Sequence, residues 1–267
     1  MTSLPTPLPE CMPLDVGLDP TRCQRLLDVL QDEIASQRLP GAVVLIGRRG
    51  KIALFESLGQ QDPATGVPMA KDAIFRIYSM TKPLVSVAVM MLMEQGQLLL
   101  SDPVEKYLPE FAESKVATEV NGQLVLQAVK QPATVQDLLR HTAGLTYEFL
   151  GTAMVQRQYA QAKVNSRDIS NAEFSRRLAA IPLMHPPGSV WEYSRATDVL
   201  GCVVEAISGM TLGAFLRSAI LHPLGMYETD FSVPSAHHHR IAEPFAHDPD
   251  GGIPMRVFDP RQVPAME

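Results

Sequence analysis

The sequence has few cysteines and no long apolar segment. Its three cysteines, Cys11, Cys23 and Cys202, are odd in number and far apart, which favours reduced thiols over a disulfide framework and predicts a cytoplasmic protein. The longest apolar run, residues 84–93, is much shorter than the roughly 20 residues that cross a membrane. Residues 1–13 are rich in proline and lack the basic start and apolar centre of a secretory signal. We therefore expect no membrane segment and no export.

Basic side chains are also scarce. Lys and Arg number 23 against 29 Asp and Glu, the formal net charge is −6, and no dense basic run occurs, which argues against a nucleic-acid partner. The acidic residues show no metal-ligand spacing, and the adjacent histidines at 237–239 cannot easily face one ion. Residues 47–50 lack the helix that follows a phosphate-binding loop. The sequence predicts neither a metal nor a cofactor.

Apolar residues, in contrast, are plentiful. They make up 46% of the 267 residues against 19% charged residues, enough for a sizeable core in one large domain or two smaller ones. The most apolar stretch, residues 85–93, contains only Ser86 as a polar residue. Such a helix is predicted to be apolar nearly all round and therefore buried.

A candidate nucleophile stands at the start of this helix, in Ser79-Met80-Thr81-Lys82-Pro83. Proline is tolerated only in the first turn, so the helix begins close to Ser79, whose hydroxyl would lie at the positive end of the helix dipole. Lys82 lies within about one helical turn of Ser79, and a lysine beside a serine can accept its proton or poise another base. A lysine at a buried helix mouth is costly unless it has partners or a use. The alternative is that Ser79 only caps the helix.

A serine–lysine pair needs a group that carries the proton to the leaving atom, and Tyr193 is the best candidate. It follows the rigid Pro-Pro-Gly turn at 186–188 and precedes an apolar helix. A phenol whose pKa is lowered by a nearby lysine can act as a general base. The alternative is a core or interface tyrosine. His141 has no evident acid partner, and we predict that it is a helix-end residue placed by the helix dipole.

The remaining patterns predict helices and one hairpin. Residues 19–38 read as an amphipathic helix capped by Asp19, with Leu26, Leu27, Leu30 and Ile34 on one face, and residues 42–46 and 52–58 read as two strands of a hairpin. Further helices are predicted at 134–141, 171–180, 196–208 and 211–221, and a small strand at 123–129. Residues 112–131 are otherwise ambiguous, and residues 151–168 are polar and weakly periodic.

These stretches occur in an order that is typical of one family. After the Ser79 motif come His141-Thr142-Ala143-Gly144-Leu145, then Pro187-Gly188 ahead of Tyr193-Ser194, then a helix that contains Asp198-Val199-Leu200-Gly201. Over roughly residues 19–233 the chain resembles the serine β-lactamase-like hydrolases: class C β-lactamases, DD-peptidases and especially family VIII carboxylesterases. The resemblance implies an α+β, β-lactamase/transpeptidase-like fold, with an antiparallel sheet flanked by helices, a helical subdomain and a site in the cleft between the two. It also implies Ser79 as nucleophile, Lys82 as the residue that keeps the proton network poised, and Tyr193 as general base.

Two features depart from the family pattern. Arg195 stands where lactamases and peptidases of the family usually carry Asn, which would bind a substrate amide differently, so the preference shifts toward esters. No Lys/His-Thr-Gly-like motif, the family's source of a second oxyanion-hole N–H, follows Tyr193 before Glu267. We therefore expect an incomplete sheet whose hairpin edge can pair with a second copy. We also expect either a fragment of a longer enzyme or weak activity, because losing one oxyanion donor costs about 10²–10³ in turnover.

The sequence predicts an N-terminal arm (1–18) and a β-lactamase-like domain (19–267), which divides into an α/β part (19–78), a helical subdomain with the central helix (79–222) and an irregular C-terminal segment (223–267). The predicted function is that of a serine carboxylesterase that cleaves small-molecule esters through an acyl-enzyme. Two alternatives stay open: a β-lactamase or D-amino peptidase of the same fold, and a non-catalytic, truncated penicillin-binding-like protein. The natural substrate, its acyl length and the oligomeric state do not follow from the sequence.

Overall fold

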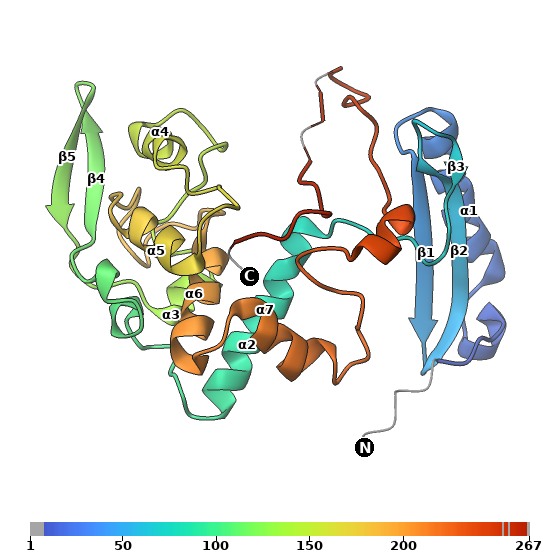
Figure 1. Cartoon of the computed structure of the whole chain (residues 1–267), viewed down its shortest axis with the longest axis horizontal. Helices are drawn as coiled ribbons and strands as arrows, with labels where there is room; N and C mark the ends of the chain where they lie inside the picture. Colours follow the sequence, from blue (N-terminus) through green and yellow to red (C-terminus); the bar gives the residue numbers. More distant parts are fainter. Residues whose placement is uncertain (1–7, 253, 256, 266–267) are drawn as a thin grey trace. The chain divides into compact units, whose positions relative to one another are not determined.

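The structure is a computed structural model that describes residues 8–252, 254–255 and 257–265. The chain divides into two compact units, which we name by their content. The sheet unit comprises Met1–Ile77 and Ser232–Gln262, and the helical unit comprises Tyr78–Phe231 and Val263–Glu267. Figure 1 shows that α1 and β1–β3 belong to the first unit and α2–α7 to the second.

The sheet unit is built on helix α1 (Pro20–Ala35) and the antiparallel strands β1 (Gly41–Arg48) and β2 (Lys51–Asp62). The predicted cap is confirmed, because the Asp19 side chain accepts a hydrogen bond from the backbone N–H of Thr21 at 2.8 Å. The predicted hairpin is confirmed too, and β2 continues far enough to pair with the short strand β3 (Val67–Pro68). At the hairpin turn Arg49 and Gly50 both have positive φ, the backbone that matches the twist of the two strands.

The buried face of α1 differs from the predicted one at a single position. Leu26 is exposed, whereas Leu27, Leu30 and Ile34 are half-buried, and Cys23 is the buried residue of the helix. Positions 23, 27, 30 and 34 follow the spacing of one helix face, and Leu26 lies beside that stripe.

Segments close to both ends of the chain complete the sheet unit. Glu10 forms a parallel bridge with Ile52 of β2, and the turn η1 (Pro13–Val16) buries Val16. On the C-terminal side, after η6 (Ser235–Arg240), the Arg76 guanidinium donates to the backbone oxygen of Ala242 and pairs with the Glu243 carboxylate, both at 2.8 Å.

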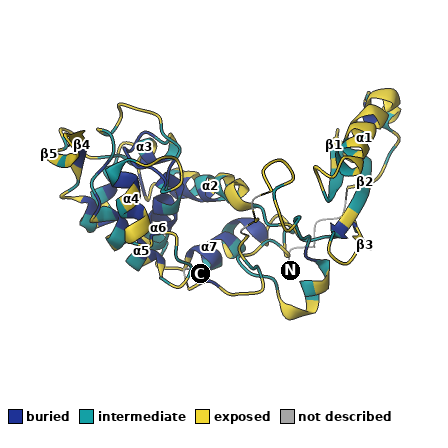
Figure 2. Cartoon of the chain, turned by 90° about the horizontal axis from the view of Figure 1, so that it is seen from above, coloured by how far each residue is buried: buried dark blue, intermediate teal, exposed yellow. Residues whose placement is uncertain are grey.

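The helical unit has α2 (Thr81–Glu94) and α6 (Ala196–Ser208) at its centre. Helix α6 contacts α2, α3 (Val135–Leu139), α5 (Asn171–Ala179) and α7 (Leu212–Leu216), and Figure 2 shows buried residues gathered in these helices. The side chains of Val199, Leu200 and Val203 on α6 are fully buried, so removal of apolar area from water holds the unit together. Its other elements are η2 (Tyr78–Met80), η3 (Val104–Lys106), η4 (Pro109–Phe111), β4 (Lys115–Val120), β5 (Gln123–Ala128), α4 (Met154–Gln161) and η5 (Arg217–Leu221).

The predicted helices at 134–141, 171–180, 196–208 and 211–221 are confirmed, the last as α7 followed directly by the π-helical turn η5. Strand β5 confirms the strand predicted at 123–129. Strand β4 was not identified, and neither was α4, which forms in the weakly periodic stretch and buries Val155 and Tyr159.

Helix α2 contributes to the core, as predicted, but through one face only. Its buried residues are Val85, Ala88, Val89 and Leu92, whereas Val87 and Met90 are 47% and 39% exposed. Pro83, Val87 and Met90 are spaced as one stripe of a helix, turned away from the buried face. An all-apolar composition shows that any face can be buried, but not which faces meet a neighbour.

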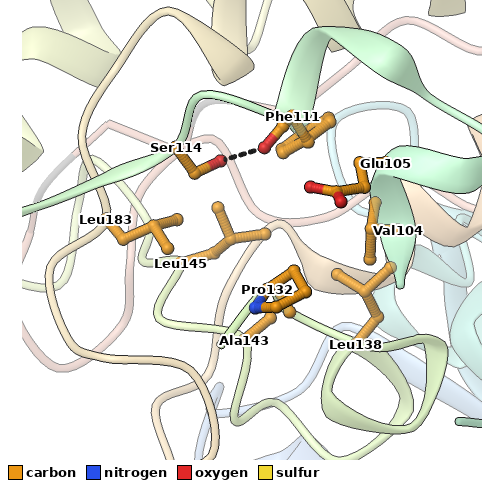
Figure 3. Close-up of a pocket in the computed structure, with 10 residues that line it drawn as sticks. Val104, Glu105, Phe111, Ser114, Pro132, Leu138, Ala143, Leu145 and Leu183 are labelled. Carbon is orange, nitrogen blue, oxygen red and sulfur yellow. Dashed lines mark hydrogen bonds between the residues drawn. The ribbon is translucent and has the colours of Figure 1, made fainter. Parts of the chain in front are cut away.

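Two hollows in the helical unit have linings that do not include Ser79, Lys82 or Tyr193. One is a pocket of about 20 Å³, large enough for about one water molecule and lined mostly by apolar side chains such as Leu138 and Leu145 (Figure 3). A groove of about 770 Å³ lies between the β4–β5 hairpin and residues 184–187.

Candidate active site

Ser79 lies in the turn η2, directly before α2. Pro83 is the third residue of α2 and therefore sits in its first turn, as predicted. Ser79 is exposed, and it is close to the positive end of the α2 dipole because only Met80 separates it from Thr81, the first residue of α2. The preceding residue, Tyr78, has a φ of 40°, a left-handed conformation that costs energy for a bulky side chain. The strained turn thus presents the hydroxyl outward.

The structure brings the three predicted site residues together. The Ser79 Oγ lies 2.5 Å from the Tyr193 phenolic oxygen, and the Lys82 ammonium donates a hydrogen bond to the same Oγ at 3.2 Å. The Lys82 Nζ also lies 4.7 Å from the centroid of the Tyr193 ring. A hydroxyl, an amine and a phenol are therefore in mutual contact, although Tyr193 is 114 residues away from Ser79 in sequence.

The position of Tyr193 is set by hydrogen bonds between two loops, residues 141–147 and residues 186–195. The backbone N–H of Glu192 donates to the His141 oxygen at 2.9 Å, and that of Arg195 donates to the Thr146 oxygen at 3.3 Å. These two bonds flank Tyr193, so the phenol is carried by a segment whose backbone is fixed on both sides.

The pKa of the Tyr193 phenol is lowered from its ordinary value. Partial burial acts to raise this pKa, but interactions with Lys82 and Ser79 and the positive charge of Lys82 outweigh it. A lowered pKa increases the fraction of phenolate near neutral pH, which is the form that accepts a proton.

His141 contacts the segment around Tyr193, which the sequence analysis did not predict. Its Nδ1 accepts a hydrogen bond from the Ser194 backbone N–H at 3.2 Å, and its ring lies 5.2 Å from the Tyr193 ring. Burial, and then the charge of Lys82, lower the pKa of the imidazole, so the neutral form that this bond requires is favoured. His141 does follow the end of α3, as predicted, but the dipole argument gave no sign of the contact with Ser194.

Arg195 points inward rather than toward the candidate nucleophile. Its guanidinium pairs with Glu148 at 2.6 Å, lies 3.6 Å from an Asp198 oxygen, and stacks 4.8 Å from the centre of the Tyr147 ring. Burial raises the pKa of Asp198, although the charge of Arg195 opposes that shift. Arg195 therefore braces the buried ring of Tyr147, which in turn packs against Tyr193 at 5.2 Å.

The Tyr193 ring belongs to a row of rings that the sequence analysis did not identify. On one side His141 follows Tyr193, with Trp191 next to His141 at 6.3 Å; on the other side Tyr147 is followed by Phe149, stacked at 4.8 Å. Trp191 lies two residues before Tyr193, and Phe149 lies two residues after Tyr147. This spacing of aromatic residues was the feature of the sequence that could have predicted the row.

No group of three or more His, Cys, Asp or Glu residues in the described part of the chain could hold a metal ion. The histidines at 237–239 lie in η6, where the His238 Nε2 is 2.8 Å from the Val233 oxygen. Among the described residues no single helix is both long and apolar enough to span a membrane; α6 and residues 212–221 pass that test only as a pair bent by 78°.

Comparisons with known proteins relate the chain to a known family. A family model described as beta-lactamase matches residues 26–264. The chain is 36% identical over 258 residues to Esterase EstB of Burkholderia gladioli, an alignment that covers 96% of this chain and 62% of EstB.

Solved structures with a similar fold include a hydrolase and a synthase. EstCE1, described as a hydrolase with promiscuous acyltransferase activity, superposes with a TM-score of 0.75 at 30% identity, covering 90% of this chain and 60% of its own. Simvastatin synthase (LovD) from Aspergillus terreus superposes with a TM-score of 0.72 at 26% identity, covering 91% and 61%. The chain thus spans about three fifths of the length of these proteins.

Proposed function

The chain belongs to the beta-lactamase family, and on that premise we propose that it is a serine hydrolase that cleaves carboxylic esters through an acyl-enzyme at Ser79. The fold predicted from the sequence, an α+β, β-lactamase/transpeptidase-like fold with helices and antiparallel sheets, is confirmed. The observation that carries the proposal is the contact of the Ser79 Oγ with both the Tyr193 phenol and the Lys82 ammonium.

In the proposed reaction, the Tyr193 phenolate accepts the proton of the Ser79 hydroxyl while the Oγ attacks the ester carbonyl carbon. The resulting tetrahedral intermediate expels the alcohol, which leaves with the proton held by Tyr193. Tyr193 then removes a proton from water, and the hydroxide releases the acid from Ser79 and restores the hydroxyl. Lys82 stays protonated and stabilises the phenolate, the role that its place near both oxygens supports.

The carbonyl oxygen becomes negative in this step, and the turn at Ser79 faces that charge with the positive end of α2. The backbone N–H of Ser79 is a donor that this turn offers to the developing oxyanion.

An ester is favoured over a β-lactam or a D-amino peptide because of where Arg195 points. At the position where related lactamases and peptidases carry Asn, the guanidinium is occupied by Glu148 and the Tyr147 ring. It does not present an amide group to a substrate amide. The similarity to Esterase EstB supports the same choice.

Acyl transfer is a second candidate function, because EstCE1 is described as having promiscuous acyltransferase activity. The same acyl-enzyme would then be attacked by an alcohol instead of water, with Tyr193 accepting the alcohol proton. An ester formed with added alcohol, at the expense of free acid, would show this branch.

We further propose three finer assignments. The sequence motifs support an assignment to the family VIII carboxylesterases within its family. The separated, unpaired cysteines support a cytoplasmic location, because all three are free in the structure. The edge of β1, which pairs only with β2 in the described sheet, supports association of two copies.

The test is a comparison of the parent with Ser79→Ala, using Ser86→Ala in the same helix as the control. The parent and the control should react with a serine-directed fluorophosphonate and hydrolyse a p-nitrophenyl ester, and Ser79→Ala should do neither. Hydrolysis of a chromogenic cephalosporin should be slower than that of the ester. Equal labelling of Ser79→Ala would overturn the proposal, and faster cephalosporin cleavage would transfer it to the lactamase alternative. An acyl ligand that binds without any burst of product would favour the non-catalytic alternative.

A further inference from the structure

The ring row around Tyr193 ends in two exposed aromatic side chains. The row runs Trp191, His141, Tyr193, Tyr147 and Phe149, with neighbouring ring centroids 4.8–6.3 Å apart. Trp191 is 67% exposed and Phe149 is 66% exposed, although residues of this size usually bury most of their apolar area. The exposed ends therefore have contact area to offer another molecule.

The carboxylates next to this row have partners inside the protein. Glu148 is occupied by Arg195. The Glu192 carboxylate accepts a hydrogen bond from Thr146, and its other oxygen lies 2.7 Å from the His185 Nε2. Lys82 lies 4.7 Å from the Tyr193 ring and Arg195 stacks on Tyr147, so cations touch the central rings of the row. The exposed ends of the row, Trp191 and Phe149, are uncharged aromatic rings.

The row is also attached directly to the candidate nucleophile, because its central ring carries the phenol that contacts the Ser79 Oγ. An ester whose carbonyl carbon meets that Oγ has two substituents, the acyl chain on one side and the alcohol on the other. Tyr193 is the middle ring of the row, which continues through His141 to the exposed Trp191 and past the buried Tyr147 ring to the exposed Phe149.

We propose that this ring row is the substrate-binding surface of the site, and that Trp191 and Phe149 select uncharged esters with an aromatic or bulky apolar group. The inference rests on the proposed function, and it adds the class of ester. Apolar rings gain contact area and stacking with such a group, whereas a small ester such as ethyl acetate reaches neither end of the row.

The kinetic test uses three uncharged esters: ethyl acetate, ethyl phenylacetate with the ring in the acyl group, and benzyl acetate with the ring in the alcohol. Trp191→Ala and Phe149→Ala should each lower kcat/KM for one of the aryl esters by about three- to tenfold, while ethyl acetate changes less than about twofold. Trp191→Phe should restore most of the loss. Tyr227→Ala, which removes another exposed aromatic ring of the helical unit, is the matched control and should leave the ratios unchanged.

A binding measurement makes the result independent of turnover. Trp191 is the only tryptophan in the sequence, so its emission reports directly on one end of the row. In Ser79→Ala, the aryl ester that loses rate in Trp191→Ala should shift the Trp191 emission to shorter wavelength in a saturable way, and ethyl acetate should not. If the parent hydrolyses no ester, both aryl esters are titrated, and one of them should give the shift.

Equal effects of Trp191→Ala and Phe149→Ala on all three esters, together with no saturable emission shift, would overturn the inference while leaving ester hydrolysis at Ser79 intact. If the parent hydrolyses no ester but the emission shift saturates with an aryl ester, the binding surface stands and the proposed function fails. Absence of both turnover and shift overturns both.

Discussion

His141 illustrates how one residue can support another without touching the reacting atoms. Its Nδ1 accepts from the Ser194 N–H, its backbone oxygen accepts from the Glu192 N–H, and its ring lies beside Tyr193. The chain on each side of Tyr193 is therefore attached to one histidine, which itself has a positive φ of 58°. A left-handed backbone at a non-glycine residue costs energy, and this one directs both the ring and the carbonyl toward the same segment.

The pH dependence of the site follows from the pKa of Tyr193. In the proposed mechanism the Tyr193 phenolate is the active form, so the rate should rise with pH through this pKa, and the Lys82 charge should shift that rise to lower pH. Replacing Lys82 by Met should move the acid limb of the kcat/KM profile to higher pH and reduce kcat/KM at neutral pH by about 10²-fold or more. Lys82→Arg keeps the charge and should keep the acid limb close to that of the parent.

The measurement is ester hydrolysis across the pH range on either side of the limb. Lys106→Met, which removes a surface ammonium paired with Asp102, is the control and should reproduce the parent profile. A Lys82→Met profile whose acid limb coincides with that of the parent would show that the cation does not set the pKa of Tyr193.

For single residues, the sequence predicted contacts between near neighbours in the chain better than contacts between distant residues. Ser79 and Lys82 could be placed together because a helix that starts near Pro83 brings residues three apart to one end of it. Tyr193 could be added only from the order of several motifs, since no local rule links it to Ser79. The inward direction of Arg195 depends on Glu148 and Tyr147, and nothing in the sequence pairs these residues.

Among the elements, the two loops that carry His141 and Tyr193 are joined where a side chain would not fit. Gly144 has a φ of 82°, and a Cβ built on it would lie 2.1 Å from the His185 backbone oxygen. The Gly144 oxygen also accepts a hydrogen bond from the Met184 N–H at 2.8 Å. The close approach of the two backbones at this point therefore requires glycine.

Gly144→Ala should consequently destabilise the protein by about 3 kcal/mol or more, because a backbone oxygen must move. Gly209→Ala is the matched control: Gly209 also has a positive φ, but its Cβ would meet nothing within 4 Å. It should lose only about 1 kcal/mol from backbone strain. Thermal unfolding and ester turnover should be measured for both variants. Equal losses of stability in Gly144→Ala and Gly209→Ala would contradict the role given to the loop contact.

Sequence patterns predicted the elements with strong periodicity or clear capping residues. The α3 helix was predicted from its apolar spacing, and the structure adds a capping box in which the Thr134 hydroxyl accepts from the Asp137 N–H. The β1–β2 hairpin was predicted from its two apolar strands and the turn between them. Helix α4 was missed because its first-turn contact comes from the Gln156 side chain, which accepts from the Ala153 N–H, and glutamine is not a specific start signal. The one-sided burial of α2 is decided by tertiary packing.

On the scale of the whole molecule, the described sheet ends in an unpaired strand. Strand β1 pairs with β2 on one side, and Leu45 on β1 is 53% exposed. An edge with free backbone groups and apolar side chains can pair with another strand. Association through this edge predicts a molecular mass in sedimentation equilibrium that rises with protein concentration.

Leu45→Lys should reduce this association, because two copies would bring like charges together at the edge. Leu99→Lys changes an exposed leucine of the helical unit and should leave association unchanged. A parent that stays monomeric at every concentration, or a Leu45→Lys variant that associates as strongly as the parent, would rule out the β1 edge as the contact.

The hydroxyl, the amine and the phenol all come from the helical unit, since Ser79, Lys82 and Tyr193 lie between Tyr78 and Phe231. Their mutual spacing is therefore an internal property of that unit and does not depend on how the sheet unit is oriented. A substitution confined to the sheet unit can in consequence leave the reacting groups at their present separations, so descendants of this chain can vary that unit while inheriting an unaltered nucleophile.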